Sequence, residues 1–315
     1  MTIAMVLRRL GMGVLTVFGV SIVIFLLLSV LPGDPLAGLL PENAQPKDRE
    51  ALAQQLGLDK PLPVRYVNWI GDLSRGDLGY SPFRRRNVAD LIAAAWQNTA
   101  ILAASSAVVG LGLGVVAGIT AAVFHGKWPD RLISTLALSG LSVPSYFVAI
   151  LLVIVFSAQL KLLPASGMHG SEGDALDFLT HLAMPLLSGS LVTLGVTARV
   201  ARASVVETFS ADFVELLRAK GLRAYQVLPH VIKNAASPVL TTSGLQVGNL
   251  LGGAVLIETI FSWPGIGALV YTAISARDLR VVQGATLVIA VTFVVLNVLV
   301  DLLQMLIDPR QRRTA

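Results

Sequence analysis

Long stretches without a charged residue constrain this chain more than any other feature of its sequence. Residues 10–31, 99–124, 132–160, 234–257 and 281–300 contain no Asp, Glu, Lys or Arg, and residues 178–198 contain only His181. About 20 apolar residues in a helix cross the ~30 Å hydrocarbon core of a bilayer. A helix also satisfies its own backbone hydrogen bonds there. The sequence therefore predicts an all-α membrane protein with six transmembrane helices.

Composition supports this class, because 54% of the residues are hydrophobic and only 14% are charged, against about 25% charged in soluble domains. Arg8 and Arg9 resemble the start of a signal peptide. The apolar run that follows is longer than the roughly 7–15 residues of a signal peptide, and no A-x-A site follows it. We expect this first span to be retained. The sequence has no cysteine, which excludes disulfides, cysteine metal ligands and cysteine nucleophiles.

Basic residues set the expected orientation. If the N-terminus is cytoplasmic, 13 basic residues fall in inner segments, and only Lys161, Arg277 and Arg280 fall in short outer loops. Short cytoplasmic loops are enriched in Lys and Arg. Both termini are therefore predicted to lie inside, and the net charge of +5 is no indication of a nucleic-acid partner.

The segment of residues 32–95 is polar and is predicted to form a subdomain outside the membrane between spans 1 and 2. It carries eight basic and eight acidic residues, with helical character at 48–56 and 64–73. Balanced charge with aromatics suits recognition of a partner, although a solvated lid over the spans is the alternative. The candidate contact residues are Tyr66, Trp69, Arg75, Asp77, Arg84, Arg85 and Arg86.

The longest polar break in the second half, residues 211–238, predicts a short amphipathic helix. Asp212 and Glu215 have the spacing of a capping box, and Gly221 can end the helix. Phe213, Leu216 and Leu217 form an apolar stripe. Such a helix docks on a partner or lies as a connector on the lipid surface. The candidate docking residues are Asp212, Phe213, Glu215, Leu216, Leu217, Arg218, Ala219, Lys220 and Gly221.

Two spans carry interruptions that indicate either a transport path or plain architecture. Pro144 bends the third span next to Ser145. Glu258 places a carboxylate at a span end, followed by Phe261 and the turn Pro264–Gly265. Glycines recur every four residues in the second and fifth spans, at 110, 114, 118 and at 244, 248, 252. Small residues at this spacing let helices pack closely, around a path, against a sister subunit or inside one bundle.

The sequence lacks the residues that several kinds of chemistry require. No G-x-x-x-x-G-K-[ST] motif is present, so the chain cannot use ATP directly, and no H-E-x-x-H motif or His cluster indicates a metal. No Ser lies at a helical spacing that addresses His181, which argues against an intramembrane protease. An ion-coupled secondary transporter usually needs ionisable groups near the midplane, whereas Glu258 and Asp301 fall near opposite span ends. The prediction is a transport subunit, not an enzyme, that is driven by another protein.

Four segments resemble one family. The run from Asp212 to Leu222 and the run from His230 to Pro238 are similar to the cytoplasmic coupling loop of ABC-importer permeases of the dipeptide/oligopeptide/nickel branch. This chain has Leu217 where that branch usually has Ala. Residues 258–283 and residues 58–63 with 75–79 resemble the same branch, so the likeness extends over nearly the full length.

The resemblance implies one of two homologous permease subunits in the cytoplasmic (inner) membrane of a prokaryote, importing di- or oligopeptides by alternating access. Nickel, glutathione or haem are alternative cargoes; mid-span His or carboxylate ligands for nickel are absent. The implied partners are a second permease, an extracytoplasmic solute-binding protein and ATPases that hold ATP and Mg. His230, Asn234 and Pro238 would support the coupling loop. The expected parts are residues 1–31 with span 1, the subdomain 32–95, the core 96–309 with coupling loop 199–236, and a cytoplasmic tail 310–315.

Overall fold

The computed structural model describes residues 3–30, 45–55, 57–170 and 173–307. The expected tail 310–315 and the first part of the expected outer subdomain, residues 32–44, lie outside these ranges. Contacts divide the chain into two compact units. The first unit comprises Met1–Val6, Ala100–Trp263 and Leu296–Ala315, and the second comprises Leu7–Thr99 and Pro264–Val295.

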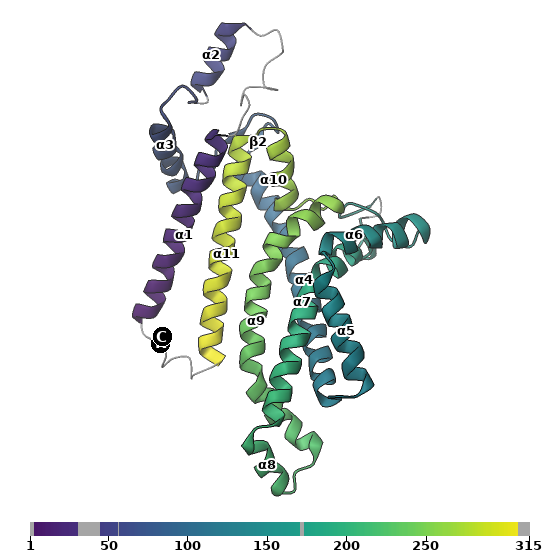
Figure 1. The fold of residues 1–315 in the computed structure, drawn as a ribbon. Coiled ribbons are helices and arrows are strands. Elements are labelled where there is room, and N and C mark those ends of the chain that lie inside the picture. Colours follow the sequence, from purple (N-terminus) through teal and green to yellow (C-terminus); the bar gives the residue numbers. More distant parts are fainter. Residues whose placement is uncertain (1–2, 31–44, 56, 171–172, 308–315) are drawn as a thin grey trace. The chain divides into compact units, whose positions relative to one another are not determined.

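The described residues contain four candidate membrane spans, or six when each of two bent stretches is counted as one span, which confirms the predicted class (Figure 1). Four are single long helices: α1 (Ile3–Val30), α4 (Val88–Val123), α7 (Ala175–Phe209) and α11 (Leu279–Ile307). The other two are bent. One joins α5 (Trp128–Ser142) to α6 (Ser145–Leu152) and the π-helix η1 (Val153–Gln159), and the other is α9 (Ala224–Ile260), which bends by 48°.

The third span turns far more sharply than the expected proline bend. Its two helical parts meet at 99°, so the chain bends at Pro144 as predicted, but it breaks into two helices there. The cause is local: a residue before proline avoids the helical region, and Val143 is extended, with φ −90° and ψ 124°. Pro144 then stands at the N-cap of α6.

The first unit is built on close contact between α4 and α7. A Cβ atom added at Gly114 would lie 2.9 Å from the Leu194 carbonyl oxygen, and one at Gly118 would lie 2.6 Å from the Ala201 Cβ. Gly110 faces α7 in the same way. The predicted close packing is confirmed for this helix, and its partner is a helix of the same unit.

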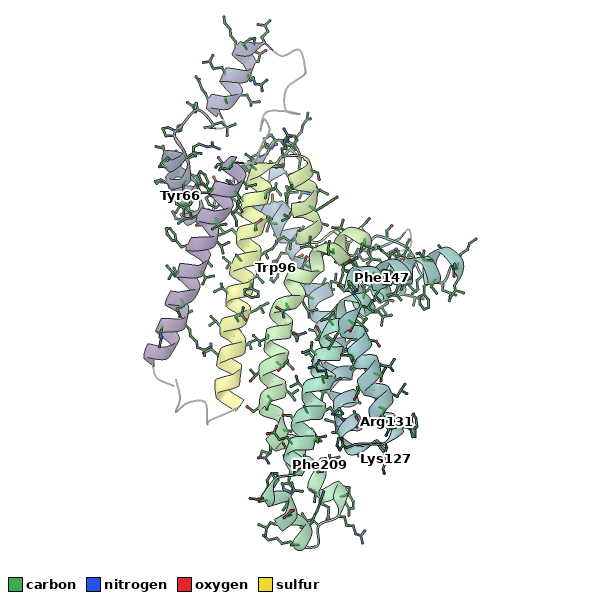
Figure 2. The ribbon with its side chains drawn as sticks, viewed as in Figure 1. Tyr66, Trp96, Lys127, Arg131, Phe147 and Phe209 are labelled. Atoms are coloured by element: carbon green, nitrogen blue, oxygen red, sulfur yellow. The ribbon has the colours of Figure 1, made fainter. Side chains whose placement is uncertain are left out.

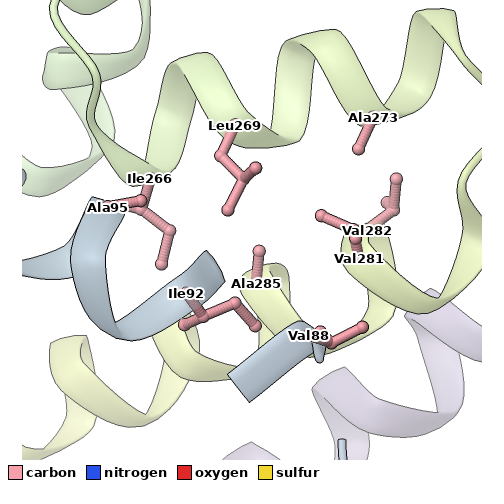
Figure 3. Close-up of a cluster of buried hydrophobic side chains, with 9 residues drawn as sticks. All are labelled: Val88, Ile92, Ala95, Ile266, Leu269, Ala273, Val281, Val282 and Ala285. Carbon is pink, nitrogen blue, oxygen red and sulfur yellow. The ribbon is translucent and has the colours of Figure 1, made fainter. Parts of the chain in front are cut away.

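The second unit holds α1 from Leu7, the outer helices α2 (Pro46–Gln55) and α3 (Leu62–Ser74), the start of α4, α10 (Ile266–Ser275) and α11 to Val295. Its core joins α4, α10 and α11, with Val88, Ile92, Leu269, Val281 and Ala285 among the buried residues (Figure 3). The sequence predicted α2 and α3 but not α10.

A short hairpin of β1 (Tyr80–Ser81) and β2 (Arg86–Asn87) completes the second unit. The Ser81 hydroxyl donates to the buried Asp278 carboxylate. The hairpin is thereby fixed to the turn between α10 and α11.

Candidate functional site

The helix α8 (Asp212–Ala219) forms where the sequence predicts it, but it begins differently. Ala211 is the N-cap, and no side chain caps the helix. The expected capping box of Asp212 and Glu215 is therefore wrong, since Asp212 already lies in the first helical turn. Both carboxylates still lie at the positive end of the helix dipole, where negative charge is favourable.

The C-terminal end of α8 is built as predicted. Gly221 adopts φ +83°, its N–H donates to the Arg218 carbonyl at 2.9 Å, and the Leu222 N–H donates to the Leu217 carbonyl at 3.2 Å. These two bonds are those of a Schellman motif. They turn the chain sharply from α8 toward α9.

One face of α8 packs on its own unit. Val214 is fully buried against Val205 of α7 and Val227 and Val231 of α9, and Phe213 and Leu217 pack on the same cluster. The predicted apolar stripe is thus only partly right, because Leu216 is 56% exposed. The missed residue is Val214, which shares a helical face with residues 213 and 217.

The opposite face of α8 is exposed and bears charges of both signs around the large apolar side chain of Leu216. Its exposed residues are Asp212, Glu215, Leu216, Arg218, Ala219 and Lys220. His230, Asn234 and Pro238 are exposed on α9, where the Asn234 amide donates to the His230 carbonyl at 2.8 Å. The exposed apolar patch of α8 is therefore Leu216 within a charged rim.

An ion pair joins α5 and α7, two helices that precede α8 in the chain. Arg202 of α7 donates from Nη2 to Oδ2 of Asp130 at 2.8 Å, and its Nε donates to Oδ1. The same carboxylate accepts the Gly126 N–H at 2.9 Å. In Figure 2, Lys127 and Arg131 lie at the N-terminal end of α5, and Phe209, the last residue of α7, lies at the same end of the unit. The pair thus braces the loop between α4 and α5 against the helix that leads into α8.

The predicted outer contact residues have separate environments in the second unit. Trp69 is 4% exposed and stacks on Phe25 at 6.0 Å between ring centroids, and the Tyr66 hydroxyl lies 2.9 Å from Ser21 Oγ of α1. These two aromatics attach α3 to α1. Asp77 accepts the Gly79 N–H. The exposed residues are Arg75, Asp77, Arg84, Arg85 and Arg86.

Arg75 also lines an outer cavity of about 560 Å³ with a basic wall. Its other cations are Lys60, Arg65, Arg277 and Arg280, beside Asp72 and Asp278. Burial and the neighbouring Arg280 guanidinium lower the pKa of Arg65. The cavity therefore presents a concentrated positive charge.

The expected gate residues lie in two groups. In the first unit, Glu258 and Phe261 are fully buried, and the Gly167 N–H donates to the Phe261 carbonyl at 2.7 Å. In the second unit, Asn98 donates to the Pro264 carbonyl, and the Thr99 hydroxyl accepts the Ile266 N–H, beside Gly265 at the N-cap of α10. Pro144 is exposed, and Ser145 lines a hollow of the first unit.

Comparison with known proteins agrees with this arrangement of spans. Residues 114–313 match the family described as "Binding-protein-dependent transport system inner membrane component". Residues 2–103 match "Binding-prot-dependent transport system membrane comp, N-term". A candidate peptide permease of Brucella ovis is 40% identical over 314 residues, covering 98% of each chain. The glutathione transport system permease protein GsiC of Escherichia coli is 39% identical over 308 residues, also covering 98% of each chain.

The fold itself is shared with a solved transporter. A chain of the MetNI methionine ABC transporter, in inward-facing form, superposes with a TM-score of 0.55 and 14% sequence identity, covering 69% of this chain and 96% of that one. The family matches extend over nearly all of the sequence and its six spans. The chain belongs to the binding-protein-dependent transport system inner membrane component family, as a permease of the peptide/nickel branch of ABC importers.

Proposed function

We propose that this chain, with a homologous second permease, forms the translocation path of an importer of di- or oligopeptides. Cytoplasmic ATPases that bind ATP and Mg supply the energy, and an extracytoplasmic binding protein delivers the cargo. The complex lies in the inner membrane of a prokaryote with both termini of this chain inside, and it works by alternating access.

The observation that carries this proposal is the division of α8 into two faces. Phe213, Val214 and Leu217 anchor the helix to α7 and α9, so a push on α8 is transmitted to two spans. The opposite face offers Leu216 within charges of both signs. An apolar centre with a charged rim is the composition of a docking surface.

Support for a peptide cargo comes from the relatives. One is named for peptides and another for glutathione, and glutathione is itself a small peptide. The relative named for glutathione makes import of glutathione the second candidate function of this chain.

The docking role is tested by Leu216→Asp in membrane vesicles reconstituted with the whole transporter. A carboxylate in the apolar centre of the contact is expected to reduce the ATPase subunits retained by about tenfold or more, and uptake with them. Leu216→Met, which keeps an apolar side chain of similar volume, serves as the matched control and should behave as the parent. Full ATPase retention and uptake by Leu216→Asp would remove α8 from the coupling role.

On the outer side we propose that Arg84, Arg85 and Arg86 contact the binding protein. All three are exposed on the hairpin, and Arg84 is held by its bond to Thr272 Oγ1 at 2.8 Å. Crosslinkers placed at position 85 should capture the binding protein during turnover. Capture of the second permease alone would contradict this assignment.

A further inference from the structure

The first unit contains a hollow of about 130 Å³ where α4, α6, α7 and α9 meet. Its polar lining comes from Ser106, Ser145, Thr193, Gln246 and Asn249, and its remaining walls are apolar or glycine. No residue of this lining is ionisable. The hollow therefore suits a ligand group that is polar and uncharged.

The polar groups of the hollow have hydrogen-bonding capacity to spare. The Ser106 hydroxyl is buried without a partner among the described residues. Gly189 keeps it accessible, because a Cβ atom at that position would lie 2.8 Å from Ser106 Oγ. A buried polar group without a partner is costly, and the cost is removed when a ligand or water binds.

The two side-chain amides are arranged as a complementary pair. Asn249 Nδ2 donates to Gln246 Oε1 at 3.3 Å. Each amide has one carbonyl and one amino group. The pair therefore retains an acceptor on Asn249 and donors on Gln246 that have no partner in the described part of the chain. A peptide backbone, which carries N–H donors and C=O acceptors, can bond to both kinds of group.

The position of the pair argues against a purely structural role. Gln246 lies in the middle of the charge-free stretch 234–257, and 8% of it is exposed, whereas Asn249 one turn later is exposed on the surface of the unit. An exposed amide near the bilayer midplane is unfavourable against lipid and marks a path or a protein contact. The hollow thus opens toward a surface that is not lipid-facing.

We propose that this hollow, the amide hollow, binds a backbone amide group of the cargo as it crosses the membrane. The inference rests on the proposed function and adds the recognition chemistry. Because peptide groups are common to all peptides, such a site accepts cargo irrespective of side chains. Its lining offers no imidazole, thiolate or carboxylate ligand for a transition-metal ion such as nickel.

The test compares two cargoes in reconstituted vesicles: trialanine, and trialanine with both peptide nitrogens methylated. The same binding protein is used throughout, so that its own preference is equal in every measurement. The transporters are the parent, Gln246→Leu, Asn249→Leu and the control Thr241→Val, which removes a hydroxyl of the same helix outside the hollow. The Thr241 hydroxyl donates to the Ser237 carbonyl one turn earlier, at 3.1 Å.

The parent should favour trialanine over the methylated form, and each amide variant should reduce that uptake ratio by about two- to tenfold, the equivalent of one hydrogen bond. The control should keep the parent's ratio, and ATP hydrolysis stimulated by the binding protein should persist in all four transporters. If Gln246→Leu fails to assemble, Asn249→Leu decides the result, because its side chain lies at the surface.

An unchanged ratio in an assembled Asn249→Leu variant would overturn the amide hollow while leaving peptide import intact. A parent transporter that hydrolyses ATP but imports neither cargo would overturn the peptide proposal and this inference together. The two failures are therefore distinguishable.

Discussion

Gly221 is the residue at which the direction of the chain after α8 is set. Its φ of +83° costs little for glycine, but a β-branched residue is strongly disfavoured there. A Cβ atom at this position would meet nothing within 4 Å. The requirement for glycine is therefore one of backbone conformation and not of space within this chain.

Gly221→Val should consequently cost about 1–2 kcal/mol of local strain and loosen the end of α8. We expect fewer retained ATPase subunits and lower uptake in vesicles, with membrane insertion unchanged. Gly126→Val is a matched control, because Gly126 has φ +77° and equally open space but lies in the loop before α5. Equal losses of ATPase in both variants would show that strain in general, and not the end of α8, causes the defect.

Among the elements, α4 and α7 show most clearly how a span is specified by its small residues. Gly118 faces α7 with no room for a side chain, whereas Gly112, on the same helix, has nothing within 4 Å of its Cβ position. Glycine inside a helix costs about 1 kcal/mol relative to alanine. Packing against α7 therefore requires glycine at position 118, whereas packing among the described residues does not require it at position 112.

Gly118→Ala should destabilise the protein by about 1–3 kcal/mol through overpacking, whereas Gly112→Ala should be neutral or slightly stabilising. Thermal unfolding in detergent, followed by tryptophan fluorescence, measures the difference. A Gly118→Ala variant as stable as the parent would mean that α4 and α7 separate without cost.

The Asp130–Arg202 ion pair between α5 and α7 leads to a second prediction about how the helices are held together. Asp130 is 5% exposed and Arg202 29% exposed in their side chains. Asp130→Asn leaves a half-buried guanidinium without its carboxylate, and the cost should be about 1–3 kcal/mol, discounted for the exposed arginine. A double-mutant cycle with Arg202→Gln measures the coupling. Additive effects of the two substitutions would contradict a direct interaction.

Local sequence patterns predicted where helices begin and end better than they predicted which side of a helix is buried. The helix α8, its end at Gly221 and the break at Pro144 follow from neighbouring residues. The burial of Val214 and the 99° corner did not follow, because they depend on which helices pack beside them. The pairs Asp130–Arg202 and Ser81–Asp278 join residues 72 and 197 positions apart, and a single sequence carries no signal for such partners.

For the whole molecule, the count of basic residues fixes an orientation that can be tested directly. The chain has no native cysteine, so single cysteines report without background. Cysteines at Lys127 and Ala224 should resist an impermeant thiol reagent added outside intact cells, and one at Arg85 should react. These three positions are exposed. Labelling at position 224 from outside would reverse the topology and exclude contact between α8 and a cytoplasmic ATPase.

The neutral lining of the amide hollow has an electrical consequence. One elementary charge that crosses 100 mV exchanges about 2.3 kcal/mol with the membrane potential. Ser106, Ser145, Gln246 and Asn249 carry no charge, so their movement during the transport cycle performs no work against that potential. A hollow of this kind contributes no gating charge, and the cargo's own net charge alone sets how voltage acts on its passage there.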